Sequence, residues 1–265
     1  MLRAAIVLLA FSVAFPVRAQ PAQPPTSTAK PAVKKPAPTK GTVAARPVTP
    51  ASSGPCIGVL APVAEHFGMK KIGITVFGND YKELPADGFK LDDLVVERVR
   101  AAAGPRVVVR KISYPRSAFD SFHQSGLLFS ASDNEQLATL LRQAVAEEAG
   151  CERYVVVLGV GLRYVGNQNV SGAGIVNTGG PLLSTTFVHA VMQITVHDGH
   201  TFAVIKKGDY PTSGANFLTG PPQERLRDFT WPDTPEAVDM PRVRAAARAL
   251  VTETLDKTLP ELLAP

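Results

Sequence analysis

The sequence predicts an α/β fold, a mixed sheet with helices packed on it, formed by a single domain over residues 56–265. Three observations support this prediction. Helix-like and strand-like segments alternate in the first half of the region, a hairpin of two alternating strands follows, and an amphipathic helix ends it. The region of about 210 residues is long enough to bury one sizeable core.

The first 19 residues are typical of a secretory signal peptide. Met1-Leu2-Arg3 is a short cationic start, residues 4–17 are apolar and uncharged, and Ala19 offers a small residue for cleavage. The apolar run of about 14 residues is shorter than the ~20 that span a bilayer. We therefore expect a cleaved export signal, no transmembrane segment in the mature chain, and a periplasmic or secreted location.

Residues 20–55 predict a disordered Pro/Ala/Lys-rich linker. They hold nine prolines and no aromatic residue, which is too little apolar surface to offset the entropy of ordering. Five of the chain's 28 lysines and arginines lie here and two in residues 1–19, so 21 remain against 23 aspartates and glutamates in residues 56–265. That balance does not indicate a nucleic-acid-binding domain. The basic linker is either a solvated spacer or makes weak contact with an anionic surface.

The chain has two cysteines, Cys56 where the linker meets the domain and Cys151 after the second predicted helix. An even number of cysteines in an exported protein favours a disulfide, which here would close a long loop. Two buried free thiols are the alternative.

Each element follows from a local pattern. β-Branched and aromatic residues predict strands, apolar residues three and four apart predict helices, and glycine or proline marks their ends. The first half is predicted as a strand or helical turn at residues 56–67, a strand at 71–77, a turn at 78–80, a helix at 91–103 and a strand at 106–113. The second half is predicted as a helix at 132–150, a central strand at 154–165, a polar loop at 166–181, a hairpin at 187–207, a loop at 209–234 and a helix from Pro241 to Pro260. Ser132 and Glu135 form the predicted capping box of the helix at 132–150.

The hairpin turn at Asp198-Gly199 is a strong two-residue turn signal. It places His197 opposite His200 and directs the face that carries Ile194 toward the core. Two imidazoles beside Asp198 are a candidate zinc or copper site. The alternative is a polar hairpin tip that holds no metal.

Two loops are candidates for recognition. Loop 209–234 carries Arg225, Arg227, Phe229 and Trp231, which are residue types enriched in interface cores. The alternative is that its aromatic residues only pack the loop onto the core. Loop 166–181 exceeds the usual length of a connection and is either functional or locally disordered. The sequence contains no Gly-x-Ser-x-Gly elbow and no phosphate-binding loop, so we expect no cofactor.

The order of elements adds a family resemblance. Residues 71–79 (KIGITVFGN), 91–104 (LDDLVVERVRAAAG) and 106–112 (RVVVRKI) resemble the opening of bacterial envelope proteins with the TolB N-terminal or CsgG-like fold, and residues 154–161 (YVVVLGVG) with the hairpin resemble its later strands. The resemblance implies a non-enzymatic periplasmic module that binds other envelope proteins. The chain departs from many members of that group because no lipoprotein cysteine follows its signal, and no binding residue carries over.

The leading hypothesis is therefore an exported, non-catalytic interaction domain in bacterial cell-envelope assembly or maintenance. It would bind other envelope proteins or cell-wall polymer through a strand edge or the two loops. One alternative is an exported hydrolase whose site assembles from distant residues such as His66, Asp120, His123 and the loop serines. The other is a metal-binding protein that uses His197 and His200.

Overall fold

The computed structural model describes residues 55–63, 65–73, 78–124, 130–145, 150–163, 168–179, 184–210 and 223–264. All of them belong to one compact unit, Thr49–Pro265. The predictions for the signal peptide at 1–19 and for residues 20–54 of the linker lie outside the described residues.

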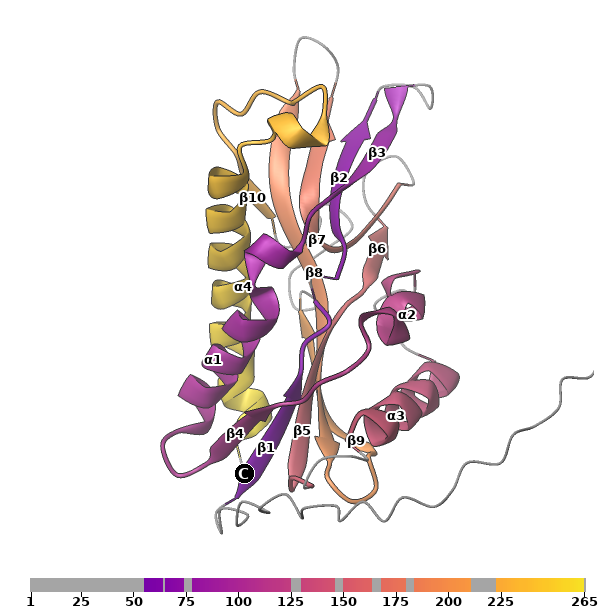
Figure 1. Cartoon of the computed structure of the whole chain (residues 1–265), viewed down its shortest axis with the longest axis vertical. Helices are drawn as coiled ribbons and strands as arrows, with labels where there is room; N and C mark the ends of the chain where they lie inside the picture. The colour runs from indigo at the N-terminus through magenta and orange to yellow at the C-terminus, as the bar shows by residue number, and fades with distance from the viewer. Residues whose placement is uncertain are drawn as a thin grey trace, which may run out of the picture. The chain divides into compact units, whose positions relative to one another are not determined.

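The described strands form one mixed sheet, as the sequence predicts (Figure 1). Its main order is β3-β2-β7-β8-β5-β1-β4, with β9 and β10 paired to β8 and β6 paired to β7. The strands are β1 (Cys56–Leu60), β2 (Phe67–Ile72), β3 (Asp80–Leu84), β4 (Val108–Lys111), β5 (Arg153–Gly159), β6 (Gly161–Arg163), β7 (Asn169–Thr178), β8 (Thr185–Asp198), β9 (Val204–Tyr210) and β10 (Gln223–Arg225). Strands β4, β1 and β5 run parallel, and β8 pairs antiparallel with all four of its neighbours.

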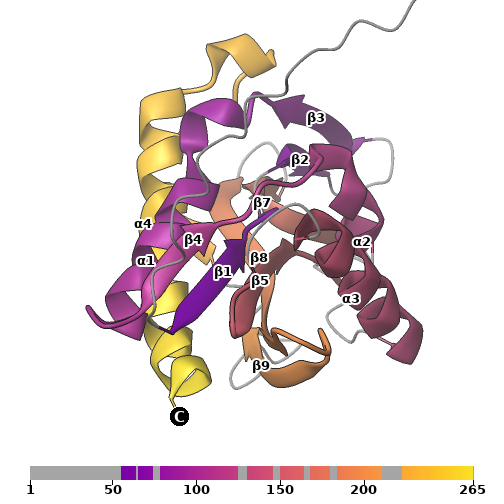
Figure 2. The same ribbon diagram turned by 60° about the horizontal axis from the view of Figure 1, so that its bottom comes forward.

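Helices cover both faces of the sheet (Figures 1 and 2). Helices α1 (Leu91–Ala103) and α4 (Met240–Leu263) lie on one face, and α2 (Asp120–Gln124) and α3 (Ala131–Val145) lie on the other. Short 3₁₀ turns stand at Asp87–Phe89, Arg116–Phe119 and Pro235–Ala237. Consecutive residues of β5 alternate between two hydrophobic clusters: Val155 packs beneath α1 and α4, whereas Val156 packs beneath α3. This strand is buried on both faces, as its continuous apolar run predicts.

The predicted loop at 166–181 is wrong, because β7 occupies most of it. This strand pairs in parallel with β2 and antiparallel with β8. Its glycines mark a close approach of neighbouring chains: a Cβ atom on Gly174 would lie 2.5 Å from the Gly68 carbonyl oxygen and 2.8 Å from His189 Nε2. Glycine, asparagine and serine indicate loops when only local conformation is weighed, but glycine also serves where a strand has no room for a side chain.

The predicted register of the hairpin is also wrong. His197 pairs with Val204 rather than with His200, and a bulge lies between Val196 and His197. The turn is longer than two residues because Asp198 Oδ1 accepts hydrogen bonds from the amides of His200 and Thr201, at 3.0 and 2.7 Å. Both faces of β8 are buried because helices cover both sides of the sheet. The face that carries His189, Gln193 and His197 is therefore as buried as the face that carries Ile194.

Other boundaries shift for local reasons. The strand predicted at 71–77 begins earlier, as β2, and residues 74–77 lie outside the described residues. The capping pair of α3 is Ser130 and Asp133 rather than Ser132 and Glu135, since the Asp133 amide donates to Ser130 Oγ and the Ser130 amide to Asp133 Oδ2. The strand predicted at 154–165 divides at Val160 into β5 and β6, and the last helix continues past Pro260. Strand β3, helix α2 and strand β10, which lies inside the predicted loop 209–234, were not predicted, because their short sequences show neither periodicity clearly.

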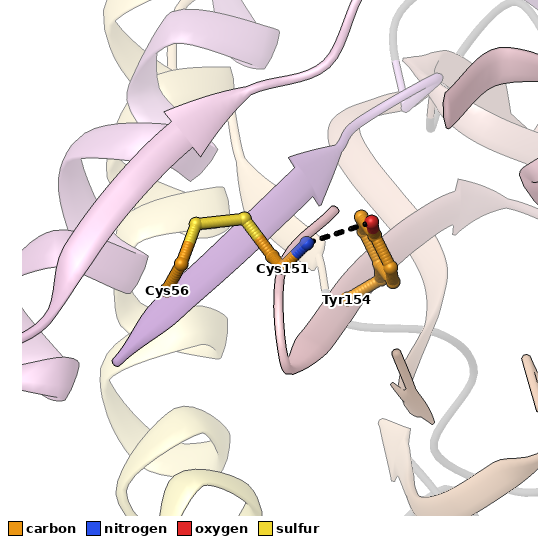
Figure 3. Close-up of a disulfide and its surroundings, with 3 residues drawn as sticks. All are labelled: Cys56, Cys151 and Tyr154. Atoms are coloured by element: carbon orange, nitrogen blue, oxygen red, sulfur yellow. Dashed lines mark hydrogen bonds between the residues drawn. A yellow bond between two sulfur atoms is a disulfide. The ribbon is translucent and has the colours of Figure 1, made fainter. Parts of the chain in front are cut away.

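The predicted disulfide is present (Figure 3). Cys56 begins β1 and Cys151 precedes β5, with 4.7 Å between their Cα atoms. The amide of Cys151 donates a hydrogen bond of 3.0 Å to the hydroxyl of Tyr154, whose ring lies over Gly58. The bridge therefore joins the two central parallel strands at the end where the domain begins.

We expect the double variant Cys56→Ser/Cys151→Ser to lose about 4–5 kcal/mol of unfolding free energy, because the bridge closes a loop of 95 residues in the unfolded chain. Urea titration of the oxidised protein measures the loss, and the reduced wild type is the matched control. A variant as stable as the oxidised wild type would contradict this expectation.

Candidate functional site

A groove of about 550 Å³ lies between β10 and α4. Its volume falls within the range of ~300–1,000 Å³ found for ligand sites. Its lining combines arginines with small apolar side chains: Glu224, Arg225, Leu226, Arg227, Arg242, Ala245, Ala246 and Ala249. Two of these arginines are recognition candidates from the sequence.

Strand β10 forms one wall of the groove. It pairs with β8 antiparallel over three residues, and the Leu226 amide extends the pairing by donating to the Thr186 carbonyl at 2.9 Å. Leu226 is buried in the cluster beneath α1 and α4, so it anchors the strand. The Arg242 guanidinium then donates to the carbonyls of Arg227 and Asp228, which ties the chain after β10 to α4.

The electrostatic character of the groove is positive. The first half of α4 carries Arg242, Arg244 and Arg248, and no acid occurs between Met240 and Thr252. Helix N-termini favour acids because the helix dipole is positive there, and here Asp239 supplies that acid as the N-cap by accepting from the Arg242 amide at 3.3 Å. Arg248 donates to the carbonyls of Phe89 and Lys90, and the Arg244 guanidinium lies over the Phe89 ring, so Arg242 is the one of these three arginines that lines the groove.

Arg225 and Arg227 are exposed, and neither guanidinium forms an ion pair or side-chain hydrogen bond with another residue that the structure describes. Phe229 and Trp231 behave differently. Both are half-buried and pack against the cluster beneath α1 and α4. The structure therefore divides the predicted recognition set: the arginines border the groove, and the aromatic residues hold the loop on the core.

Sequence reasoning missed the part of the groove that α4 provides. For Arg242, Ala245 and Ala249 the sequence predicts only that they belong to the last helix. The signal that could have found them is the run of three arginines without an acid in the first half of that helix. The proximity of β10 to α4 has no signal in the sequence, since about 17 residues separate Arg225 from Arg242.

A second cluster brings together two residues of the hydrolase hypothesis. His66 Nε2 lies 3.2 Å from Asp120 Oδ1, and His66 Nδ1 lies 3.5 Å from Glu83 Oε2. Partial burial lowers the pKa of His66, but the hydrogen bonds and charges of Asp120 and Glu83 outweigh it and raise the pKa above the ordinary 6.5. The side chain of His123 lies outside the described residues. Both ring nitrogens of His66 face carboxylates, whereas a nucleophilic triad needs one of them to face a hydroxyl or thiol.

The His66 bridge predicts a pH effect. The folded pKa is raised, so its stabilisation is complete below about pH 6.5 and is lost as pH rises through the folded value. The side chain is 40% exposed, so we expect an effect below ~1 kcal/mol. Proton NMR titration should give His66 a pKa above the ordinary 6.5, and Glu83→Gln/Asp120→Asn should lower it. The same His66 pKa in the wild type and in the double variant would refute the bridge.

The candidate metal ligands His197 and His200 do not converge. His197 is fully buried, and its Nδ1 donates to the Phe202 carbonyl at 2.9 Å, so its Nε2 accepts from the Thr195 hydroxyl at 2.9 Å. His200 is exposed in the turn. Within the described residues no group of three His, Cys, Asp or Glu side chains is arranged to hold a metal ion.

His189 lies on the same polar face of β8 and is fully buried. Its Nδ1 lies 3.2 Å from the Gly172 carbonyl and donates to it. Burial lowers the pKa of His189 to about 4, although the bond to Gly172 opposes the shift; the charge of Lys70 adds to it. The neutral ring is thus a structural donor between β8 and β7, and its Nε2 faces Gly174.

His189 predicts acid sensitivity of the fold. Its folded pKa lies below the unfolded value of 6.5, so the unfolded chain takes up the proton first and stability falls as pH drops from about 6.5 to 4. The loss approaches about 3 kcal/mol at the lower end. Urea titrations between pH 7 and 5 measure it, and His189→Asn, which retains a donor but cannot titrate, should show a flatter profile. Parallel profiles would contradict the assignment.

No protein-family model matches the sequence, and no curated protein matches it. Among the described residues, no helix is long and apolar enough to cross a membrane.

Proposed function

We propose that this chain is an exported, non-catalytic interaction domain that works in the bacterial cell envelope and is held on a basic, proline-rich tether. The domain binds another envelope component through the groove between β10 and α4. The single observation that carries the proposal is that two exposed arginines without an ion-pair partner among the described residues border a groove at a sheet edge.

The cost of this arrangement supports a binding role. Within the described residues, Arg225 and Arg227 have no carboxylate at ion-pair distance, so neither charge gains that stabilisation from the fold. Unpaired charges that do not stabilise the fold are expected to gather at a binding site, because there the ligand supplies the opposite charges. Arginine is also the cationic side chain best suited to bind a carboxylate, because its planar guanidinium can donate two parallel hydrogen bonds to the two carboxylate oxygens.

Export is supported by two features. The start of the sequence fits a signal peptide, and the disulfide between Cys56 and Cys151 is of the kind that persists in oxidising compartments. Residues 20–55 would then act as a spacer before the domain, and their five basic residues would favour contact with an anionic surface.

The alternative function is an exported hydrolase at the His66 cluster. It is favoured by the 3.2 Å contact between His66 and Asp120, which lie 54 residues apart. The carboxylates on both sides of the ring fit a protonated bridge between strand β3 and helix α2 better than a general base, because a base needs a free nitrogen toward the substrate.

The test is site-specific photo-crosslinking of the full chain in producing cells. A photoreactive residue at Arg227 should form an adduct with an envelope component, and the same residue at exposed Thr201, in the hairpin turn, should not. Absence of an adduct at Arg227, or equal adducts at both positions, would contradict the proposal.

Charge reversal sharpens this test. We expect Arg225→Glu with the crosslinker at 227 to reduce adduct yield about tenfold, since an attraction becomes a repulsion. The matched control is Arg100→Glu, which reverses an exposed arginine on α1 outside the groove. Equal losses in the two variants would indicate a general charge effect rather than a site.

A further inference from the structure

We propose that the edge of β10 that faces away from β8 takes an extended, acidic segment of a partner protein as an added strand, seated in the groove beside α4. This inference rests on the interaction function proposed above and specifies the partner's chemistry and binding mode.

The backbone of β10 offers the necessary hydrogen-bonding groups. The bond from the Leu226 amide to Thr186 makes that pair a hydrogen-bonded one in the antiparallel ladder. Arg225, which stands opposite Phe187, therefore occupies a non-hydrogen-bonded position, and its N–H and C=O point away from β8. Among the described residues no other strand pairs with β10. An edge of this kind is a template for a further strand.

The opposite wall leaves space for that strand. Ala245, Ala246 and Ala249 are the residues of α4 that line the groove beyond Arg242, and a methyl group is the largest side chain they present. Side chains this small leave room between α4 and β10 for an extended chain.

The charges select an acidic partner. Three arginines and one glutamate line the groove. The register places Glu224 opposite Val188 and Arg225 opposite Phe187, so these two side chains project from opposite faces of the strand. An added strand meets Arg225 on one face, where a glutamate or aspartate directly across forms a favourable cross-strand pair. Arg227 lies in the turn that follows β10, has no ion-pair partner among the described residues, and can bind a second carboxylate.

Two other occupants fit less well. A second copy of this chain that paired antiparallel through β10 would bring the arginines of the two copies together, and like charges across strands are unfavourable. The chain's own residues 20–55 contain five basic residues and no acid, so they repel the groove as well.

The experiment selects peptides from a display library of random dodecapeptides on the purified mature chain. We expect the enriched peptides to carry a net charge of about −2 or lower, with alternating β-branched residues that suit a strand. Enrichment of neutral or basic peptides, or no enrichment, overturns the proposal.

A pair of substitutions at one position then separates charge from strand addition. Arg225→Ala removes the guanidinium, and Arg225→Pro also removes the outward N–H while sparing the ladder to β8, since proline is tolerated at such an edge position. Titration of an enriched peptide should show a several-fold loss for Arg225→Ala and a further loss of about fivefold for Arg225→Pro. Equal affinities of the two variants overturn the strand geometry. Urea titration of both variants checks that the fold is kept.

Failure of this inference is distinguishable from failure of the proposed function. If linear polyphosphate binds as tightly as the peptide and Arg225→Ala matches Arg225→Pro, the ligand is an anionic polymer and the peptide proposal is wrong. If the library yields nothing while Arg227 still forms adducts in cells, the groove binds a folded surface and only this inference fails. If both experiments fail, the proposed function fails as well.

Discussion

The structure depends on the pairing of β8 with four strands at once. One edge of this strand pairs first with β7 and then with β5, and the other pairs with β10 and then with β9. The β5-β1-β4 part of the sheet and the β7-β2-β3 part are therefore joined through a single backbone. Its even-numbered side chains, such as Ile194, pack beneath α1 and α4, and the odd-numbered face lies beneath the other helical layer. A change that disturbs β8 acts on the whole sheet.

The polar face of β8 shows how the fold satisfies buried groups. His189 and His197 each donate to a backbone carbonyl, and Thr195 completes the second pair. Gln193 is the exception, since its side-chain amide is buried and neither its oxygen nor its nitrogen has a hydrogen-bond partner among the described residues. Buried unsatisfied groups of this kind are rare in native proteins. His189 is neutral for a related reason, because burial without a carboxylate partner favours the uncharged ring.

Where one interaction decides a local structure, the sequence predicts it well. Helix α1 has the predicted bounds, the cysteines pair, and the fold class is confirmed. Prediction failed where a distant segment decides. The glycines of β7 are explained by His189 and Gly68 rather than by a turn. The error in the hairpin is of a different kind, because there a local cap by Asp198 lengthens the turn. The candidate site follows the same division: its arginines were visible in the sequence, whereas the wall of alanines opposite them required the packing of α4 beside β10.

The disulfide also determines how the domain responds to a mechanical pull. Because it joins Cys56 to Cys151, a force applied between the linker and the C-terminus passes through the sulfur atoms and bypasses the 94 residues between the two cysteines. Strands β1 to β4 and helices α1 to α3 then lie outside the covalent path of the force (Figure 1). The first structures to bear tension are instead β5, which follows Cys151, and α4, which ends next to the C-terminus. Such a pull would load α4, which lines the candidate groove, and after reduction of the disulfide it would act on β1 at the start of the domain instead of on β5.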